Sequence, residues 1–443
     1  TGFDTAWIGS SNLSKAALVD GLEWNIRASR VTTPEVIDKF AGTFEAYWSD
    51  SHFEPYDPDH DADRFDEFVG RATTEHPLDF SFVDIRPYPF QQEMLDRLQG
   101  ERERHDRHRN LVVAATGTGK TIVAALDYRR LRDQLDSSRL LFVAHRAEIL
   151  NQSLNVFRAA LRDGTFGELY VQGQRPDRWE NVFASIQSLS SYDPRQIDPR
   201  HFDVVIVDEF HHAAANTYRA LLNHVHPRVL LGLTATPERA DGQSVLEWFD
   251  DRIAVELRLW DALDQDLLVP FHYFGIHDDV DLSELTWSRG GYQTADLENL
   301  YTGHDARVAK VLEAVSDKIG DPASMMALGF CVSIAHAEYM ARKFNEAGIR
   351  SEAVSADTSA EARAAALRKL RDGLLNVVFA VDLFNEGVDV PQVDTVLFLR
   401  PTESATIFLQ QLGRGLRRAG GKSVLTVLDF VGQQHRKFRF DLK

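Results

Sequence analysis

Two series of short apolar runs, separated by stretches with helical spacing, dominate the chain from about residue 81 to its end. In the first series the runs are Leu111–Ala115, Leu140–Ala144, Val182–Ile186, Val204–Asp208 and Val229–Leu233. They are short, β-branched and apolar on both faces, as is typical of parallel strands covered by helices on both sides. Residues 122–135 and 147–161 lie between them with helical spacing. This alternation predicts a doubly wound α/β domain over residues 81–265.

The pattern recurs over residues 302–443 and predicts a second domain of the same class. Its expected strands are Met326–Val332, Ser351–Val354, Val377–Val381, Val396–Leu399 and Val424–Leu428, and its expected helices are Ala335–Ala347, Ala360–Arg371 and Ser404–Leu412. Residues 266–301 have a mixed pattern, so we expect a connector or an insertion there.

The first 80 residues differ from the rest. Residues 1–49 suggest part of an α/β domain, and residues 50–80 form a polar, proline-broken and acidic stretch that favours a solvated linker. Aspartates alternate from Asp57 to Asp63 as in a calcium loop, but Ala62 and Phe68 stand where such a loop needs Gly and Glu. A linker is therefore the better interpretation.

Composition narrows the class of protein. The 443 residues are 44% hydrophobic, and the longest apolar runs have strand length, so no membrane span is expected. Cys331 is the single cysteine, which excludes a disulfide framework and favours a reducing, cytoplasmic location. The formal net charge is −18, of which residues 1–80 contribute −10, whereas residues 414–443 carry +6. Nucleic-acid binding depends on local basic surface, so the acidic total does not exclude it.

A candidate phosphate site follows the run Leu111–Ala115. Thr116, Gly117, Thr118 and Gly119 form a tight turn, and Lys120 and Thr121 come at the start of the next helix. A helix N-terminus presents free backbone N–H groups to an anion, and glycines let the backbone close around phosphate oxygens. Lys120 is expected to reach the β- and γ-phosphates, and the Thr121 hydroxyl to bind Mg²⁺. Ala114 stands where the strict phosphate-loop pattern has Gly.

Two carboxylates follow the run Val204–Val207, at the carboxyl end of a predicted strand, where open α/β sheets bind ligands. We expect Asp208 to hold Mg²⁺ and Glu209 to orient and deprotonate the attacking water. His211 and His212 lack the third His or the Cys that a zinc site needs. His211 is instead expected to hydrogen-bond toward Thr234 and Thr236 and so to couple the phosphate site to a moving part.

The segment Gln410–Arg417 belongs to the second domain and contains Gln410, Gly413, Arg414 and Arg417. An inserted arginine stabilises charge on the transferred phosphoryl group and accelerates the reaction by about 10³–10⁵. Because these arginines lie on the far domain, we expect hydrolysis to depend on closure of the cleft.

Together these motifs resemble superfamily 2 helicases and translocases of the DExH kind, over about residues 82–432. The resemblance implies two RecA-like domains in tandem, with ATP and Mg²⁺ as cofactors. It also implies adenine recognition by Arg86 and Gln91, contacts with the nucleic-acid strand by Arg146, Gln187 and Asp382, and nucleotide contacts by Gly387 and Asp389.

A second resemblance covers about 30 residues near the N-terminus. Gly9–Ser14 and Gly21–Asn25 are similar to the end of a phospholipase D-like nuclease domain. The His-x-Lys pair of that superfamily does not precede Gly9, and the sequence begins with Thr1 rather than Met. We therefore expect a fragment of a longer nuclease–helicase fusion.

The resulting hypothesis is an ATP-dependent helicase or translocase that moves along a strand, with DNA favoured over RNA by analogy. The alternative is an ATP-gated conformational switch that controls an attached phospholipase D-like nuclease without translocation.

Overall fold

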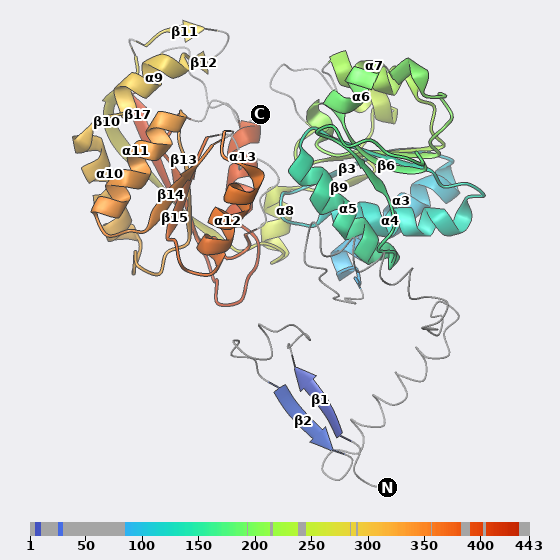
Figure 1. Cartoon of the computed structure of the whole chain (residues 1–443), viewed down its shortest axis with the longest axis horizontal. Helices are drawn as coiled ribbons and strands as arrows, with labels where there is room; N and C mark the ends of the chain where they lie inside the picture. The colour runs from blue at the N-terminus through green and yellow to red at the C-terminus, as the bar shows by residue number, and fades with distance from the viewer. Residues whose placement is uncertain are drawn as a thin grey trace. The chain divides into compact units, whose positions relative to one another are not determined.

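The computed structural model describes residues 85–433, except 193, 213–215, 238–244, 284, 289–290, 356, 382–389 and 402–404, and two strands nearer the N-terminus. These strands, β1 (Thr5–Gly9) and β2 (Asn25–Ser29), form an antiparallel pair. The chain divides into a unit over Thr1–Ser81 and a second unit over Phe82–Lys443. The second unit contains both predicted parallel-sheet α/β domains, which confirms the predicted fold class (Figure 1).

The first domain is built on a seven-stranded sheet in which all neighbouring strands run parallel. In sheet order its strands are β5 (Glu168–Tyr170), β6 (Asn181–Ser185), β4 (Leu140–Ala144), β7 (Val204–Val207), β8 (Val229–Thr234), β3 (Arg109–Ala114) and β9 (Val255–Leu257). Its helices are α3 (Pro89–His105), α4 (Lys120–Gln134), α5 (Ala147–Leu161), α6 (Ile186–Tyr192), α7 (Asn216–His224) and α8 (Leu259–Asp264), with short 3-10 turns at Pro194–Gln196, Phe210–His212 and Leu246–Phe249.

Alternating strand residues divide the core of this domain into two layers. Leu140, Phe142 and Ala144 of β4 pack with α3, α4 and α5, whereas Leu141 and Val143 pack with α6 and α7 on the other face (Figure 1). All five strand residues are fully buried. Burial on both faces explains why the strands have continuous apolar runs rather than alternating ones.

The second domain has a six-stranded sheet whose neighbouring strands are again parallel. In sheet order its strands are β10 (Phe271–Asp281), β17 (Leu425–Gln433), β16 (Thr395–Phe398), β13 (Ala327–Phe330), β15 (Val377–Ala380) and β14 (Ser351–Val354). Residues of α10 (Asp305–Lys318) and α11 (Ile334–Glu346) cover one face, and residues of α12 (Ala360–Arg371) and α13 (Ala405–Gly415) cover the other (Figure 1).

The segment that the sequence left unassigned, residues 266–301, contributes the edge strand β10, which pairs with β17 near the end of the chain. It continues into a small hairpin, β11 (Trp287–Ser288) and β12 (Gly291–Tyr292), and into α9 (Thr294–Tyr301). Polar residues such as His272 and His277 interrupt the apolar pattern because β10 has a neighbour on one side only and is partly exposed. Among the described helices, none has the length and apolar character of a membrane span.

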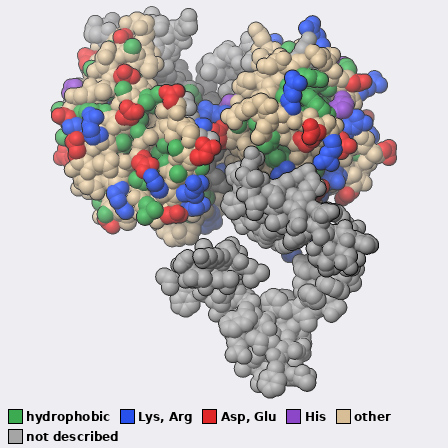
Figure 2. Space-filling view, in the orientation of Figure 1, with side chains coloured by type: hydrophobic (Ala, Val, Ile, Leu, Met, Phe, Trp, Pro, Cys, Tyr) green, Lys and Arg blue, Asp and Glu red, His purple; other side chains and the backbone are tan. Residues whose placement is uncertain are grey.

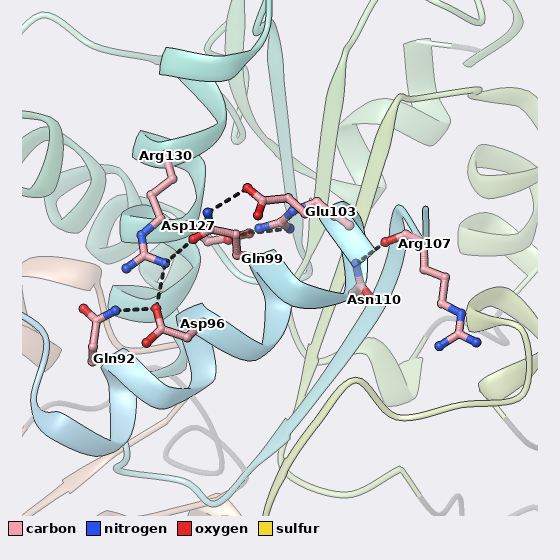
Figure 3. A network of polar contacts seen from close by, with 9 residues as sticks. Gln92, Asp96, Gln99, Glu103, Arg107, Asn110, Asp127 and Arg130 are labelled. Atoms are coloured by element: carbon pink, nitrogen blue, oxygen red, sulfur yellow. Dashed lines mark hydrogen bonds and ion pairs between the residues drawn. The ribbon is translucent and has the colours of Figure 1, made fainter. Parts of the chain in front are cut away.

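The helices α3 and α4 are joined by a buried ion pair. Both guanidinium Nη atoms of Arg102 donate to the carboxylate of Asp127, and the two side chains are 7% and 1% exposed. A solvated chain of contacts runs alongside it, from Gln92 through Asp96 to Arg130 (Figure 3). Because α4 begins at Lys120 and α3 carries Gln91, the buried pair fixes one candidate nucleotide residue relative to the other.

We predict that Asp127→Asn lowers the free energy of unfolding by about 3–5 kcal/mol, because it leaves the Arg102 charge buried without a carboxylate. Urea denaturation measures this change. The matched control is Asp96→Asn on the exposed chain in Figure 3, which we expect to change stability by less than about 0.5 kcal/mol. Equal effects of the two substitutions would contradict the assigned role of the buried pair.

Candidate functional site

The sheet register brings distant segments of the first domain to one edge. Val113 of β3 lies opposite Thr234 of β8, and Val207 of β7 lies opposite Gly232 of β8. The residues that follow β3 and β7 therefore emerge on either side of the end of β8. Position 232 has no room for a side chain, because a Cβ there would lie 2.5 Å from the Phe249 ring that packs on the sheet.

The loop after β3 has the conformation of a phosphate cradle. Gly117 and Gly119 have φ values of +94° and +82°, in the region that favours glycine. Thr118 Oγ1 donates to the Ala115 carbonyl at 2.8 Å, and Gln91 Nε2 donates to the Thr118 carbonyl at 3.0 Å. A Cβ at Gly119 would lie 2.6 Å from Gln91 Nε2, so a side chain there would displace the Gln91 amide.

Lys120 is the first residue of α4, and its Nζ donates to the Ala114 carbonyl at 3.0 Å. Burial lowers the pKa of Lys120, and the carboxylates of Glu209 and Asp208 oppose this shift. Arg414 and Arg417, from the second domain, lower the pKa further. The ammonium group thus lies in the combined field of both candidate acids and both candidate arginines.

Asp208 and Glu209 follow β7 and are each 7% exposed. Glu209 has a φ of +48°, an uncommon conformation for a residue other than glycine, and its N–H donates to Asp208 Oδ1 at 2.9 Å. Such a conformation costs on the order of 1–3 kcal/mol and is often found at functional sites. The strained backbone turns the two consecutive carboxylates to one region, with Glu209 Oε2 lying 3.4 Å from His211 Nδ1.

A chain of polar contacts leads from this acid pair to the second domain. His211 Nδ1 lies 3.3 Å from Thr234 Oγ1, which donates to the Thr236 carbonyl at 2.8 Å. On the other side of the ring, Gln410 Nε2 lies 3.3 Å from His211 Nε2. His211 therefore lies with Thr234 and Glu209 on the Nδ1 side of its ring and with Gln410 on the Nε2 side.

Two further contacts bring the arginine segment against the phosphate loop. A Cβ at Gly413 would lie 2.5 Å from Thr116 Cβ, and a Cβ at Gly117 would lie 3.1 Å from Arg417 Cγ. A third contact between the domains lies away from this segment, where Arg363 of α12 pairs with Glu148 of α5 at 2.8 Å. The structure therefore brings together the sequence-predicted residues Thr116, Lys120, Glu209, Gln410 and Arg417.

The chemistry of this cluster fits a magnesium-bound triphosphate. Among the described residues, the groups that act electrostatically on Lys120 are two carboxylates and two guanidinium groups. Within the same part of the chain, the buried oxygens Thr116 Oγ1, Thr236 Oγ1 and Glu209 Oε2 have no hydrogen-bond partner. The hydroxyl of Thr121 and the carboxylate of Asp208 are oxygen ligands of the type that Mg²⁺ prefers.

Three of the other predicted residues lie in the described part of the chain, near the starts of helices. Arg86 is exposed just before α3, Arg146 is the residue that precedes α5, and Gln187 is exposed in the first turn of α6. Arg146 Nε lies 3.3 Å from His145 Nε2. Asp382, Gly387 and Asp389 lie outside the described residues. The sequence analysis missed Leu268, whose Cδ2 would be 3.3 Å from a Cβ at Gly117, because nothing in its local pattern distinguishes it.

Comparison with known families matches both domains. Residues 84–239 match the family described as type III restriction enzyme, res subunit, and residues 310–419 match the helicase conserved C-terminal domain. The chain carries the paired domains of superfamily 2 helicases. This pairing supports an ATP-hydrolysing enzyme, and ATP is used in this family typically with Mg²⁺.

Several curated proteins are similar to this helicase core. A Saccharomyces cerevisiae protein named as an ATP-dependent helicase, IRC3, is 27% identical over 72% of this chain and 48% of its own length. The type I restriction enzyme EcoAI endonuclease subunit of Escherichia coli is 26% identical over 73% of this chain and 44% of its own length. The chain thus spans about half the length of these relatives.

Solved structures share the fold. A fragment of an HsdR subunit of a type I restriction enzyme from Vibrio vulnificus superposes with a TM-score of 0.60 at 22% identity, over 83% of this chain and 68% of that one. The restriction-modification enzyme LlaBIII bound to DNA also gives 0.60, at 18% identity, over 79% of this chain and 28% of that one. At these identities the likeness shows the RecA-like fold of the two domains.

We predict that Gly413→Ala lowers ATPase activity at least about tenfold without lowering the melting temperature. Gly413 is helical, so alanine favours α13 by about 0.5–1 kcal/mol, but its Cβ forces α13 away from Thr116. Steady-state ATPase assays and thermal melting measure the two effects. Gly420→Ala is the control, because a Cβ at Gly420 meets no atom within 4 Å. Wild-type activity of Gly413→Ala would show that this contact is not needed for turnover.

Proposed function

We propose that this chain is an ATP-dependent motor that couples ATP hydrolysis to movement along a nucleic-acid strand, with DNA favoured over RNA. The observation that carries the proposal is the contact of the second domain with the phosphate loop and the acid pair of the first: Gly413 and Arg417 pack against Thr116 and Gly117, and Gln410 lies 3.3 Å from His211. Lys120, Asp208, Glu209, Arg414 and Arg417 share one electrostatic environment there. A cluster that needs both domains makes hydrolysis dependent on their approach, which is the basic requirement for a motor.

Each residue has a role in the proposed reaction. The magnesium-bound nucleotide supplies the anhydride that is cleaved. Lys120 and the two arginines neutralise charge on the phosphoryl group, and the backbone N–H groups at the start of α4 hold its oxygens. Glu209 takes the proton of the attacking water, and His211 lies beside its carboxylate, with Nδ1 3.4 Å from Glu209 Oε2.

The same contacts supply the coupling. Gln410 contacts His211 only when the second domain lies against the first, and His211 contacts both Glu209 and Thr234. Loss of the γ-phosphate removes the anion that balances Lys120, Arg414 and Arg417, so these cations then repel one another. Hydrolysis in this scheme separates the domains, and binding of a new nucleotide closes them.

The strand is proposed to lie along the carboxyl ends of β4 and β6. These strands are neighbours, with Ala144 opposite Ser185, so Arg146 and Gln187 lie at the same edge of the sheet. The starts of α5 and α6 also present backbone N–H groups to phosphates there. The names of the relatives, a restriction endonuclease subunit and a restriction-modification enzyme bound to DNA, support DNA over RNA.

Binding of the nucleic-acid strand must depend on local positive charge at this edge rather than on the net charge of the chain. In Figure 2 basic and acidic side chains are interspersed over both domains, so no single-signed field covers the face that is shown. Phosphate contacts at a few positions such as Arg146 are therefore expected to dominate the affinity.

We predict that Lys120→Ala and Glu209→Gln each lower kcat by about 10²–10³ or more, because one removes a cation from the developing charge and the other removes the base. A coupled-enzyme ATPase assay measures the loss, and binding of a non-hydrolysable ATP analogue should survive in Glu209→Gln. Lys369→Met is a control, since Lys369 pairs with Glu352 on the exposed surface of the second domain. Undiminished turnover in Glu209→Gln would reject the assigned base.

We predict that DNA stimulates the ATPase more than RNA does, and that Arg146→Ala weakens DNA binding equally across sequences. Loss of one phosphate contact lowers the slope of log affinity against log salt by about 1. Single-stranded DNA, duplex DNA and RNA are titrated at several salt concentrations. Identical basal and nucleic-acid-added rates throughout would contradict the motor.

Displacement of a triplex-forming strand distinguishes the motor from the alternative, an ATP-gated switch acting on an attached phospholipase D-like nuclease. Displacement that requires ATP and Glu209 supports translocation. Closure upon nucleotide binding without displacement would favour the switch.

A further inference from the structure

Arg417 lies outside regular secondary structure. The helix α13 ends at Gly415, two residues before it. A side chain that must reach the phosphate loop from irregular backbone needs its main chain held by other contacts. The neighbouring residues supply two of these, since the Leu416 carbonyl accepts from Val269 N–H at 2.8 Å and Arg418 Nη1 donates to the Asp266 carbonyl at 2.5 Å.

The main chain of Arg417 itself is held by a lysine. Lys422 Nζ donates to the Arg417 carbonyl at 3.0 Å and to the Pro391 carbonyl at 2.9 Å. Pro391 follows the stretch in which Gly387 and Asp389 are the predicted nucleotide contacts. One ammonium group therefore joins the backbone at Arg417 to the backbone at Pro391.

We propose that Lys422 is a positioning residue for Arg417: its ammonium group ties the Arg417 carbonyl to Pro391 and so sets the guanidinium group against the phosphate loop. The proposal rests on the proposed ATP hydrolysis in this cleft. Arg417 packs directly beside Gly117 of the phosphate loop, where a Cβ would lie 3.1 Å from Arg417 Cγ. A misplacement of about 1 Å at a reacting centre can cost on the order of 10²-fold in rate.

The charge of Lys422 is sensitive to its surroundings. Burial lowers its pKa to about 8, the Asp394 carboxylate opposes that shift, and the Arg417 guanidinium group adds to it. Asp394 and Arg417 are thus the charged groups that face this ammonium. Since a lysine loses its proton as pH rises, the charge-assisted bonds to both carbonyls weaken above about pH 8, whereas an arginine at this position stays charged.

The first experiment compares Lys422→Met, Lys422→Arg and the wild type in steady-state ATPase assays. We expect Lys422→Met to lower kcat by about ten- to a hundredfold with KM changed less than about twofold, because the nucleotide still binds but the Arg417 guanidinium group is misplaced. Lys422→Arg should restore most of the rate. In an Arg417→Ala background, Lys422→Met should have no further effect, since the positioned group is gone. An equal loss in both backgrounds would identify a merely structural role and overturn the proposal.

The pH profile is a second readout. Between pH 6.5 and 9.5 the wild type should lose kcat as pH rises through about 8, and this limb should be absent in Lys422→Arg. A limb that persists unchanged in Lys422→Arg belongs to another group and would overturn the assignment of this titration to Lys422.

Hydrogen exchange tests the contact of Lys422 with the Arg417 backbone without measuring ATP turnover. Peptides that cover residues 416–421 should exchange faster in Lys422→Met than in the wild type, and Lys369→Met should leave them unchanged. Faster exchange in a protein whose ATPase does not depend on Lys120 would contradict the proposed function but support the positioning role of Lys422. Unchanged exchange together with wild-type kcat would contradict the positioning role alone.

Discussion

The structure of the site depends on keeping the buried ammonium group of Lys120 charged. Burial disfavours this charge, and two nearby carboxylates oppose that effect. Asp208 and Glu209 are 88 and 89 residues away in the sequence, so the compensation requires β3 and β7 to end at the same edge, on either side of β8. The parallel sheet provides this alignment, and the buried strands that form it also contribute a large part of the core of the first domain.

The second domain contributes two arginines, Arg414 and Arg417, to the site. Arg414 and Arg417 add positive charge to a region that already contains Lys120, so an anion between them offsets repulsion among these cations. In the proposed cycle a triphosphate therefore stabilises the contact between the domains, and departure of the γ-phosphate removes that stabilisation.

The sequence predicted the strands, the helices and the phosphate loop well because buried strands and glycine turns leave local signals. The strand Leu140–Ala144 and the helix 147–161 were predicted to the residue. The strand β10 was missed because an edge strand needs no continuous apolar run. Contacts such as Gln410 with His211, Leu268 beside Gly117 and Lys422 with Arg417 depend on tertiary packing, so no spacing rule reveals them.

The ion pair between Glu148 and Arg363 extends this argument from the nucleotide to the strand. Glu148 lies in the first turn of α5, two residues after Arg146, where its negative charge opposes a phosphate that approaches the helix N-terminus. Arg363 of the second domain neutralises that charge at 2.8 Å. When the domains separate, the carboxylate at the N-terminus of α5 loses its partner, and the field that a nearby phosphate experiences becomes less favourable. In the proposed motor, binding of a strand at this edge would therefore vary with the same domain contact that completes the nucleotide site.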